Sequence, residues 1–70
     1  MAAEIEIQVN GESRRVARGM SVEDLLASLD LQPKMIVVEH NGDILRKGSY
    51  AEVDVAEGDA LELVHFVGGG

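Results

Sequence analysis

The chain contains no cysteine and no tryptophan, and its 70 residues include one proline, one tyrosine and one phenylalanine. The absence of cysteine excludes disulfide bonds, thiolate metal ligands and a cysteine nucleophile, and it fits a reducing compartment. Because Tyr50 and Phe66 are the two aromatic residues, the core must be aliphatic. A chain this short forms one small domain, without room for a second domain or a deep substrate cleft.

Long apolar runs and positive charge are also scarce. No apolar run reaches the about 20 residues that span a bilayer, and the N-terminus does not resemble a signal peptide. We therefore expect a cytoplasmic protein. Six basic and thirteen acidic residues give a net charge of −7, which argues against binding to phosphate backbones. The acidity serves solubility or steers the domain toward a basic partner.

The first half of the chain predicts a β-hairpin followed by a helix. Residues 4–9 alternate between polar and apolar, Asn10-Gly11 suits a type I′ turn, and residues 12–17 read as the returning strand. Ser21 begins a helix as its N-cap, and Pro33 ends it near Asp30. The apolar stripe of this helix consists of Val22, Leu25, Leu26 and Leu29.

The second half predicts further strands. Residues 35–40 are β-branched and apolar, which favours a strand inside a sheet, and a turn at Asn41-Gly42 leads to a short strand at 43–45. The next residues read as a polar loop (46–49) and a short turn or 3₁₀ element that packs Tyr50 at the edge of the core. After a turn at 57–59, residues 60–67 form the last strand.

This order of elements predicts an α+β fold, with a mixed four- to five-stranded sheet and one main helix packed across one face. The last strand is expected in the middle of the sheet, beside the first strand and parallel to it. Residues 1–67 form the folded domain, and residues 68–70 form a flexible Gly-Gly-Gly tail.

The C-terminus has the most distinctive chemistry of the chain. Gly68 and Gly69 make a thin tether, since glycine has no Cβ, and Gly70 ends in a carboxylate that is ionised at neutral pH. Such a tail fits into a narrow active site of another protein. We therefore predict that Gly70 is the working group and that Gly68 and Gly69 enter the active site of a partner.

The last strand also predicts a docking surface. If Leu61 and Leu63 face the core, alternation places Val64 and Phe66 on the outer face, next to the tail. Phe66 is then an anchor for a partner, or alternatively it covers the core of a domain with few aromatic residues. His65 is too close to a mobile tail to act as a base with fixed geometry.

The remaining ionisable residues predict no site. His40 has no second ligand at a metal-binding spacing, so no metal centre is expected. The acidic residues Asp54, Glu57 and Asp59 lack the spacing of a calcium loop and read as a solvated turn.

Several short motifs together resemble a known family. They are Val9-Asn10-Gly11, Ser21-Val22-Glu23-Asp24-Leu25-Leu26, Ile36-Val37-Val38-Glu39, Asn41-Gly42, Gly58-Asp59 and the ending Val64-His65-Phe66-Val67-Gly68-Gly69-Gly70. In this combination the chain is similar to the ThiS-type sulfur carriers of thiamine biosynthesis, which have the ubiquitin-like β-grasp fold. The resemblance covers nearly the whole chain.

The resemblance implies a carrier that other enzymes act on and that is not itself a catalyst. A ThiF-like, E1-type enzyme uses ATP and Mg²⁺ to adenylate Gly70, and a cysteine desulfurase or other donor then supplies sulfur to give a thiocarboxylate. Thiazole synthase (ThiG) takes up that sulfur, and no cofactor stays bound to the carrier.

Three alternatives remain at this point. The chain also fits the sulfur-carrying small subunit of molybdopterin synthase, a ubiquitin-like protein modifier, or a binding module whose tail has no chemical role.

Overall fold

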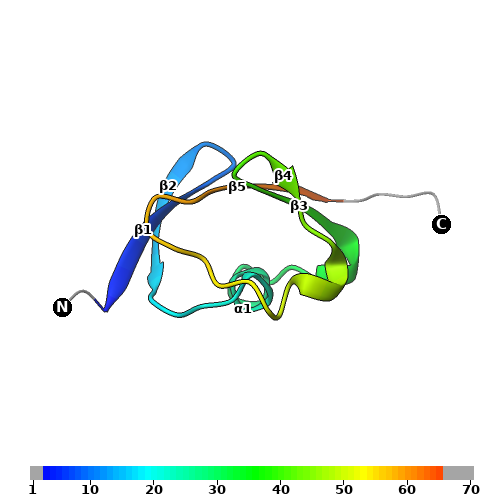
Figure 1. Cartoon of the computed structure of the whole chain (residues 1–70), viewed down its shortest axis with the longest axis horizontal. Coiled ribbons are helices and arrows are strands. Elements are labelled where there is room, and N and C mark those ends of the chain that lie inside the picture. Colours follow the sequence, from blue (N-terminus) through cyan, green and yellow to red (C-terminus); the bar gives the residue numbers. More distant parts are fainter. Residues whose placement is uncertain (1–2, 66–70) are drawn as a thin grey trace.

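In a computed structural model, which describes residues 3–65, the chain folds into a five-stranded sheet crossed by one helix (Figure 1). The strands are β1 (Glu4–Val9), β2 (Glu12–Ala17), β3 (Ile36–His40), β4 (Asp43–Ile44) and β5 (Ala60–His65), and the helix is α1 (Val22–Ser28). Two short 3₁₀ turns, η1 (Pro33–Met35) and η2 (Lys47–Ser49), flank β3 and β4 in the sequence.

The strand order is β2-β1-β5-β3-β4, so β5 lies in the centre of the sheet. It runs parallel to β1, as the sequence predicts, and antiparallel to β3. Both Asn-Gly turns have positive φ at both residues (52° and 84° at Asn10-Gly11, 53° and 90° at Asn41-Gly42), which is the type I′ geometry. The α+β fold, the central position of β5 and its parallel pairing are therefore confirmed.

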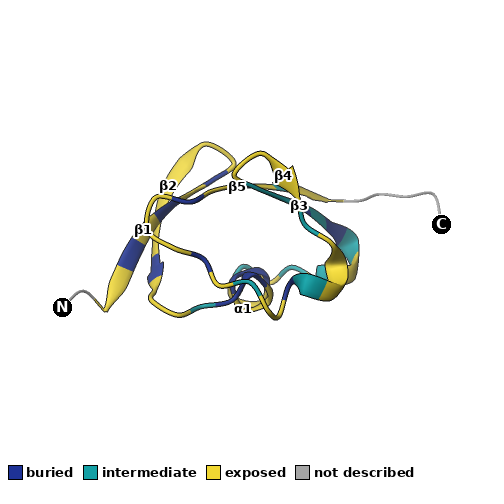
Figure 2. Cartoon of the chain, in the orientation of Figure 1, coloured by how far each residue is buried: buried dark blue, intermediate teal, exposed yellow. Residues whose placement is uncertain are grey.

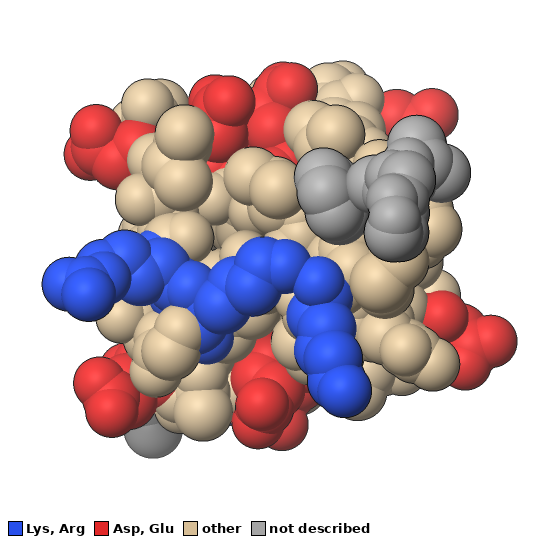
Figure 3. All heavy atoms as spheres, turned by 90° about the vertical axis from the view of Figure 1, so that its right-hand side faces the viewer, with Lys and Arg blue, Asp and Glu red and all other residues tan. Residues whose placement is uncertain are grey.

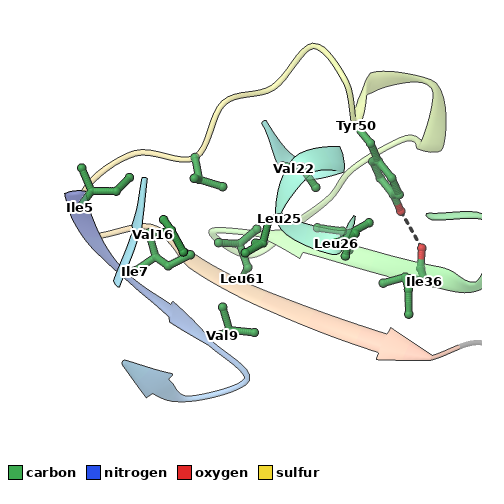
Figure 4. Close-up of a cluster of buried hydrophobic side chains, with 12 residues drawn as sticks. Ile5, Ile7, Val9, Val16, Val22, Leu25, Leu26, Ile36, Tyr50 and Leu61 are labelled. Atoms are coloured by element: carbon green, nitrogen blue, oxygen red, sulfur yellow. Dashed lines mark hydrogen bonds between the residues drawn. The ribbon is translucent and has the colours of Figure 1, made fainter. Parts of the chain in front are cut away.

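The core lies between α1 and one face of the sheet (Figure 2). Strand β1 alternates strictly, with Ile5, Ile7 and Val9 inward, whereas β2 buries only Val16, because it is an edge strand. Figure 4 shows these side chains meeting Val22, Leu25 and Leu26 of α1 and Leu61 of β5.

Tyr50 lies inside the core, whereas the sequence predicts it at the edge. Its side chain is 1% exposed, and its hydroxyl donates a hydrogen bond of 2.8 Å to the carbonyl of Ile36 (Figure 4). This hydrogen bond satisfies the Tyr50 hydroxyl inside the protein, so the whole aromatic side chain can be buried. The 3₁₀ turn of this region lies just before Tyr50, within the segment predicted as a polar loop.

Helix α1 begins with a complete capping box and ends in a Schellman motif. Ser21 Oγ accepts from the amide of Asp24, and the Asp24 carboxylate accepts from the amide of Ser21. At the other end, the amides of Asp30 and Leu31 donate to the carbonyls of Ala27 and Leu26. The helix stops at Ser28, two residues before the predicted end, because Asp30 adopts a left-handed conformation (φ 62°).

Candidate functional site

The predicted site residues lie on or directly after β5, because this strand leads to the C-terminus. Predicted site residues Phe66, Gly68, Gly69 and Gly70 lie outside the described residues, as does the predicted extension of β5 to residue 67. Val64 is described, and the structure places it as the sequence predicts. It is 54% exposed and points away from the core, whereas Leu61 is buried and Leu63 packs against the core.

Val64 belongs to an apolar strip on the outer face of the sheet. It lies directly opposite Val37 on β3, and Ile44 on β4 lies opposite Glu39 on the same face. Ile44 is 70% exposed, and Val64 and Ile44 are the large apolar side chains that the described part of the chain leaves open. Two acids, Glu39 and Glu62, face each other across this strip. The outer face near the end of β5 is thus apolar with an acidic component.

Two asparagine side chains hold β5 in register from either side. The amide group of Asn10 accepts from the Leu63 N–H (2.8 Å) and donates to the Leu63 carbonyl (3.3 Å), as a neighbouring strand would. On the other side, Asn41 Oδ1 accepts from the amide of Ala60 (2.9 Å). Each Asn-Gly turn therefore forms a hairpin and also fixes the strand that leads to the C-terminus.

Asp59, just before β5, is a buried hydrogen-bond acceptor and not part of a solvated turn. Its carboxylate accepts from His40 Nε2 (2.8 Å), Asn41 Nδ2 (3.1 Å) and the amide of Ala56 (2.8 Å). Burial by itself raises the pKa of Asp59, but these hydrogen bonds together hold it below the ordinary value of 3.8. Asp54 and Glu57 remain exposed, as predicted.

Sequence patterns do not predict the roles of Asp59, Asn10 and Asn41 beyond their turns. Apart from the Ala56 amide, which is three residues from Asp59, their partners lie 18 to 53 residues away in the sequence, and no local pattern reports contacts over such separations. His40 has a structural partner in Asp59. Within residues 3–65, no three His, Asp or Glu side chains gather in a metal-binding arrangement.

A groove of about 400 Å³ opens on the helix side of the sheet, near the end of β5. Val9, Leu31, Ile36 and Leu63 contribute apolar side chains to its wall, and Arg14 and His65 contribute polar ones. His65 is exposed. No helix in the described part of the chain has the length and apolar character needed to cross a membrane.

Comparisons with known proteins identify relatives over nearly the whole chain. The sequence profile of the ThiS family matches residues 7–70. The "Sulfur carrier protein ThiS" of Bacillus subtilis (strain 168) is 42% identical over 65 residues, which cover 91% of this chain and 98% of that protein. A "Thiazole synthase" of Paramagnetospirillum magneticum is 44% identical over 66 residues, or 94% of this chain. This chain spans 20% of the length of that synthase.

Solved structures agree with the sequence matches. The crystal structure of a thiamine biosynthesis protein (ThiS) from Geobacter metallireducens has a TM-score of 0.81 at 35% identity, covering 94% of this chain and 100% of that one. A computationally designed protein based on human erythrocytic ubiquitin has a TM-score of 0.56 at 20% identity, covering 99% of this chain and 98% of that one. The second likeness shows the fold alone, which is the ubiquitin-like β-grasp.

Proposed function

The chain belongs to the ThiS family, and from this membership we propose that it is the sulfur carrier for the thiazole ring of thiamine. The observation that supports this proposal most strongly is the 42% identity with a sulfur carrier over 98% of that protein's length. The Gly68-Gly69-Gly70 ending provides the group that the chemistry requires.

The proposed chemistry takes place at the carboxylate of Gly70. A carboxylate is a poor electrophile, so an oxygen of Gly70 first attacks the α-phosphorus of ATP, and pyrophosphate leaves. A reduced sulfur nucleophile, equivalent to hydrosulfide, then attacks the acyl carbon and displaces AMP, which leaves a thiocarboxylate. Activation thereby divides one difficult substitution into two easier ones. Glycine suits this position, because no side chain obstructs attack at its carbonyl carbon.

In this proposal the catalytic groups belong to partner enzymes, and this chain is their co-substrate. A ThiF-like, E1-type enzyme adenylates Gly70 with ATP and Mg²⁺, and a cysteine desulfurase or another donor provides the sulfur. Where the donor holds this sulfur as a persulfide, a thiol reductant supplies the two electrons that bring it to the level of hydrosulfide. The reactions take place in the cytoplasm, where ATP is available. The chain itself retains no cofactor.

Thiazole synthase is the proposed acceptor of the sulfur. In Paramagnetospirillum magneticum, a segment similar to 94% of this chain lies within a protein named thiazole synthase. Presence in one polypeptide gives two domains a high effective concentration, which suits a carrier and the enzyme that uses its cargo. We infer that this chain delivers its sulfur to the same type of enzyme.

We propose that the partners dock on the outer face of β5, through Val64 and Phe66. Val64 supports this proposal, since it is exposed beside Val37 on a surface next to the end of the strand. Apolar side chains on an open sheet face are typical of contact surfaces. Phe66 follows two positions later and is the proposed aromatic anchor.

Intact mass spectrometry of the native protein tests the function. In cells grown without thiamine, we expect a fraction with one oxygen replaced by sulfur, and fragmentation places this change on Gly70. A variant without Gly70 serves as the control and should show no shift and no support of thiamine-independent growth. Conjugates to lysine residues without a sulfur shift would identify a protein modifier instead. A shift that responds to molybdenum cofactor demand and not to thiamine would redirect the proposal to that pathway.

A further inference from the structure

Three of the six basic residues of this acidic chain lie close together at one end of the molecule. Figure 3 shows Lys and Arg side chains in a nearly continuous band across the end at which β5 finishes. Lys34 lies in η1, Arg46 caps η2, and Lys47 begins η2. The Lys47 ammonium donates to the carbonyl of Lys34, which joins the two turns. We call Lys34, Arg46 and Lys47 the basic band.

The cations of the basic band are not neutralised within residues 3–65. Arg15 pairs with Glu4, whereas Lys34, Arg46 and Lys47 form no ion pair within these residues. Lys34, Arg46 and Lys47 are all exposed. Arg14 adds a fourth exposed cation nearby, because it lines the groove together with Leu31 and Ile36, which flank η1. In a chain with thirteen acids, this separation leaves a positive surface that is open to a partner.

We propose that the basic band binds an acidic surface on thiazole synthase, around the entrance through which that enzyme receives Gly70. This inference rests on the proposed function and adds the chemistry of the docking surface to it. Five residues follow His65, and even a fully extended chain of this length spans at most about 18 Å. An enzyme that reacts with Gly70 must therefore come close to the end of the molecule that bears the band.

Complementary charge suits a carrier that binds and leaves repeatedly. Attraction between opposite charges accelerates encounter and fixes orientation, whereas exposed pairs add little to the lifetime of a complex. Outside the basic band, thirteen acidic residues outnumber the three remaining basic ones, so an acidic partner surface is repelled more strongly by the other faces. Val64 and its apolar neighbours on the outer face then add the contact that excludes water.

The test measures binding of the intact chain to purified thiazole synthase from the same organism, by calorimetry at low and at physiological salt. We expect the variant K34E/R46E/K47E to bind about tenfold more weakly at low salt and to lose the salt dependence of the wild type. The single variant R46E should show part of this loss. R15E is the matched control for R46E, because Arg15 lies on β2, at the opposite edge of the sheet from β3 and β4 and outside the basic band, and it should change Kd less than twofold.

Equal or tighter binding of the triple variant, or no binding of the wild type, would overturn the proposal. Circular dichroism and thermal unfolding verify that each variant is folded, which is expected since all three side chains are exposed. Failure of the docking inference is distinguishable from failure of the function. The mass of Gly70 reports on sulfur carriage even if the basic band has no part in binding the synthase.

Discussion

At the scale of single residues, Asp30 occupies a position that normally favours glycine. It is the first residue after the cap of α1, with φ of 62°, and its carboxylate lies at the negative end of the helix dipole. Replacing Asp30 with Gly removes both the backbone strain and the unfavourable charge. We expect D30G to raise the free energy of unfolding by about 0.5–1 kcal/mol, measured by urea denaturation. D43G at the exposed edge strand is the control and should not stabilise; an unstable D30G would contradict this account of the helix end.

Asp59 makes stability depend on pH in a defined direction. Hydrogen bonds hold its pKa in the folded protein below the ordinary value of 3.8. The carboxylate therefore stabilises the fold at pH values above 3.8, and this contribution is lost as the pH falls through the lower, folded-state pKa. We expect D59N to be less stable than the wild type at pH 7 and the difference to shrink as the pH falls below the ordinary pKa of 3.8. Denaturant titrations at several pH values measure it, and a difference that does not vary with pH would refute it.

Asn10 acts at the boundary between turn and strand. The N10G variant keeps a residue that accepts φ of 52° but removes the two hydrogen bonds to Leu63. We expect N10G to cost about 1–2 kcal/mol and to increase amide hydrogen exchange at Leu63. N41G is a useful comparison, because Asn41 accepts a hydrogen bond from the amide of Ala60. In this variant the increase in exchange should therefore appear at Ala60. Unchanged exchange at Leu63 would show that Asn10 is only a turn residue.

At the scale of elements, the outer face of β5 is open to substitution without damage to the core. Val64 is more than half exposed, so V64E should change the free energy of unfolding by less than about 1 kcal/mol. If the outer face docks partners, V64E should raise KM for adenylation several-fold while kcat changes little, because Gly70 is untouched. S13E, on the outer face of β2 at the far edge of the sheet, is the control. Equal KM values for V64E and wild type would remove Val64 from the docking surface.

Local patterns predicted the elements well and the long-range contacts poorly. Alternation in β1 and β5 depends on the two-residue repeat of a strand, so it placed Ile5, Ile7 and Val64 on their observed faces. The depth of Tyr50 depends on the carbonyl of Ile36, 14 residues away, and sequence periodicity does not record such a partner. The carboxylate of Asp59 was misread for the same reason, since acidic residues near a glycine resemble an exposed turn until their partners are known.

At the scale of the whole molecule, the net charge of −7 opposes the compact state. Salt shortens the range of repulsion from about 30 Å at 0.01 M to about 8 Å at 0.15 M. We therefore expect Tm to rise by a few degrees between these concentrations, since about 1 kcal/mol corresponds to about 4–8 °C for a domain of this size. The E62Q variant relieves the pair of acids that face each other across β3 and β5 and should reduce the rise. A Tm that is independent of salt would contradict the repulsion.

The central place of β5 has a mechanical consequence. A force applied to the end of β5 along its axis would load all the bonds of this strand, which is paired with β3 on one side and with β1 and Asn10 on the other (Figure 1). Hydrogen bonds loaded in this direction are sheared together, whereas those of an edge strand pulled sideways open one after another. The domain is therefore suited to bear tension on its C-terminal end through repeated cycles without unfolding.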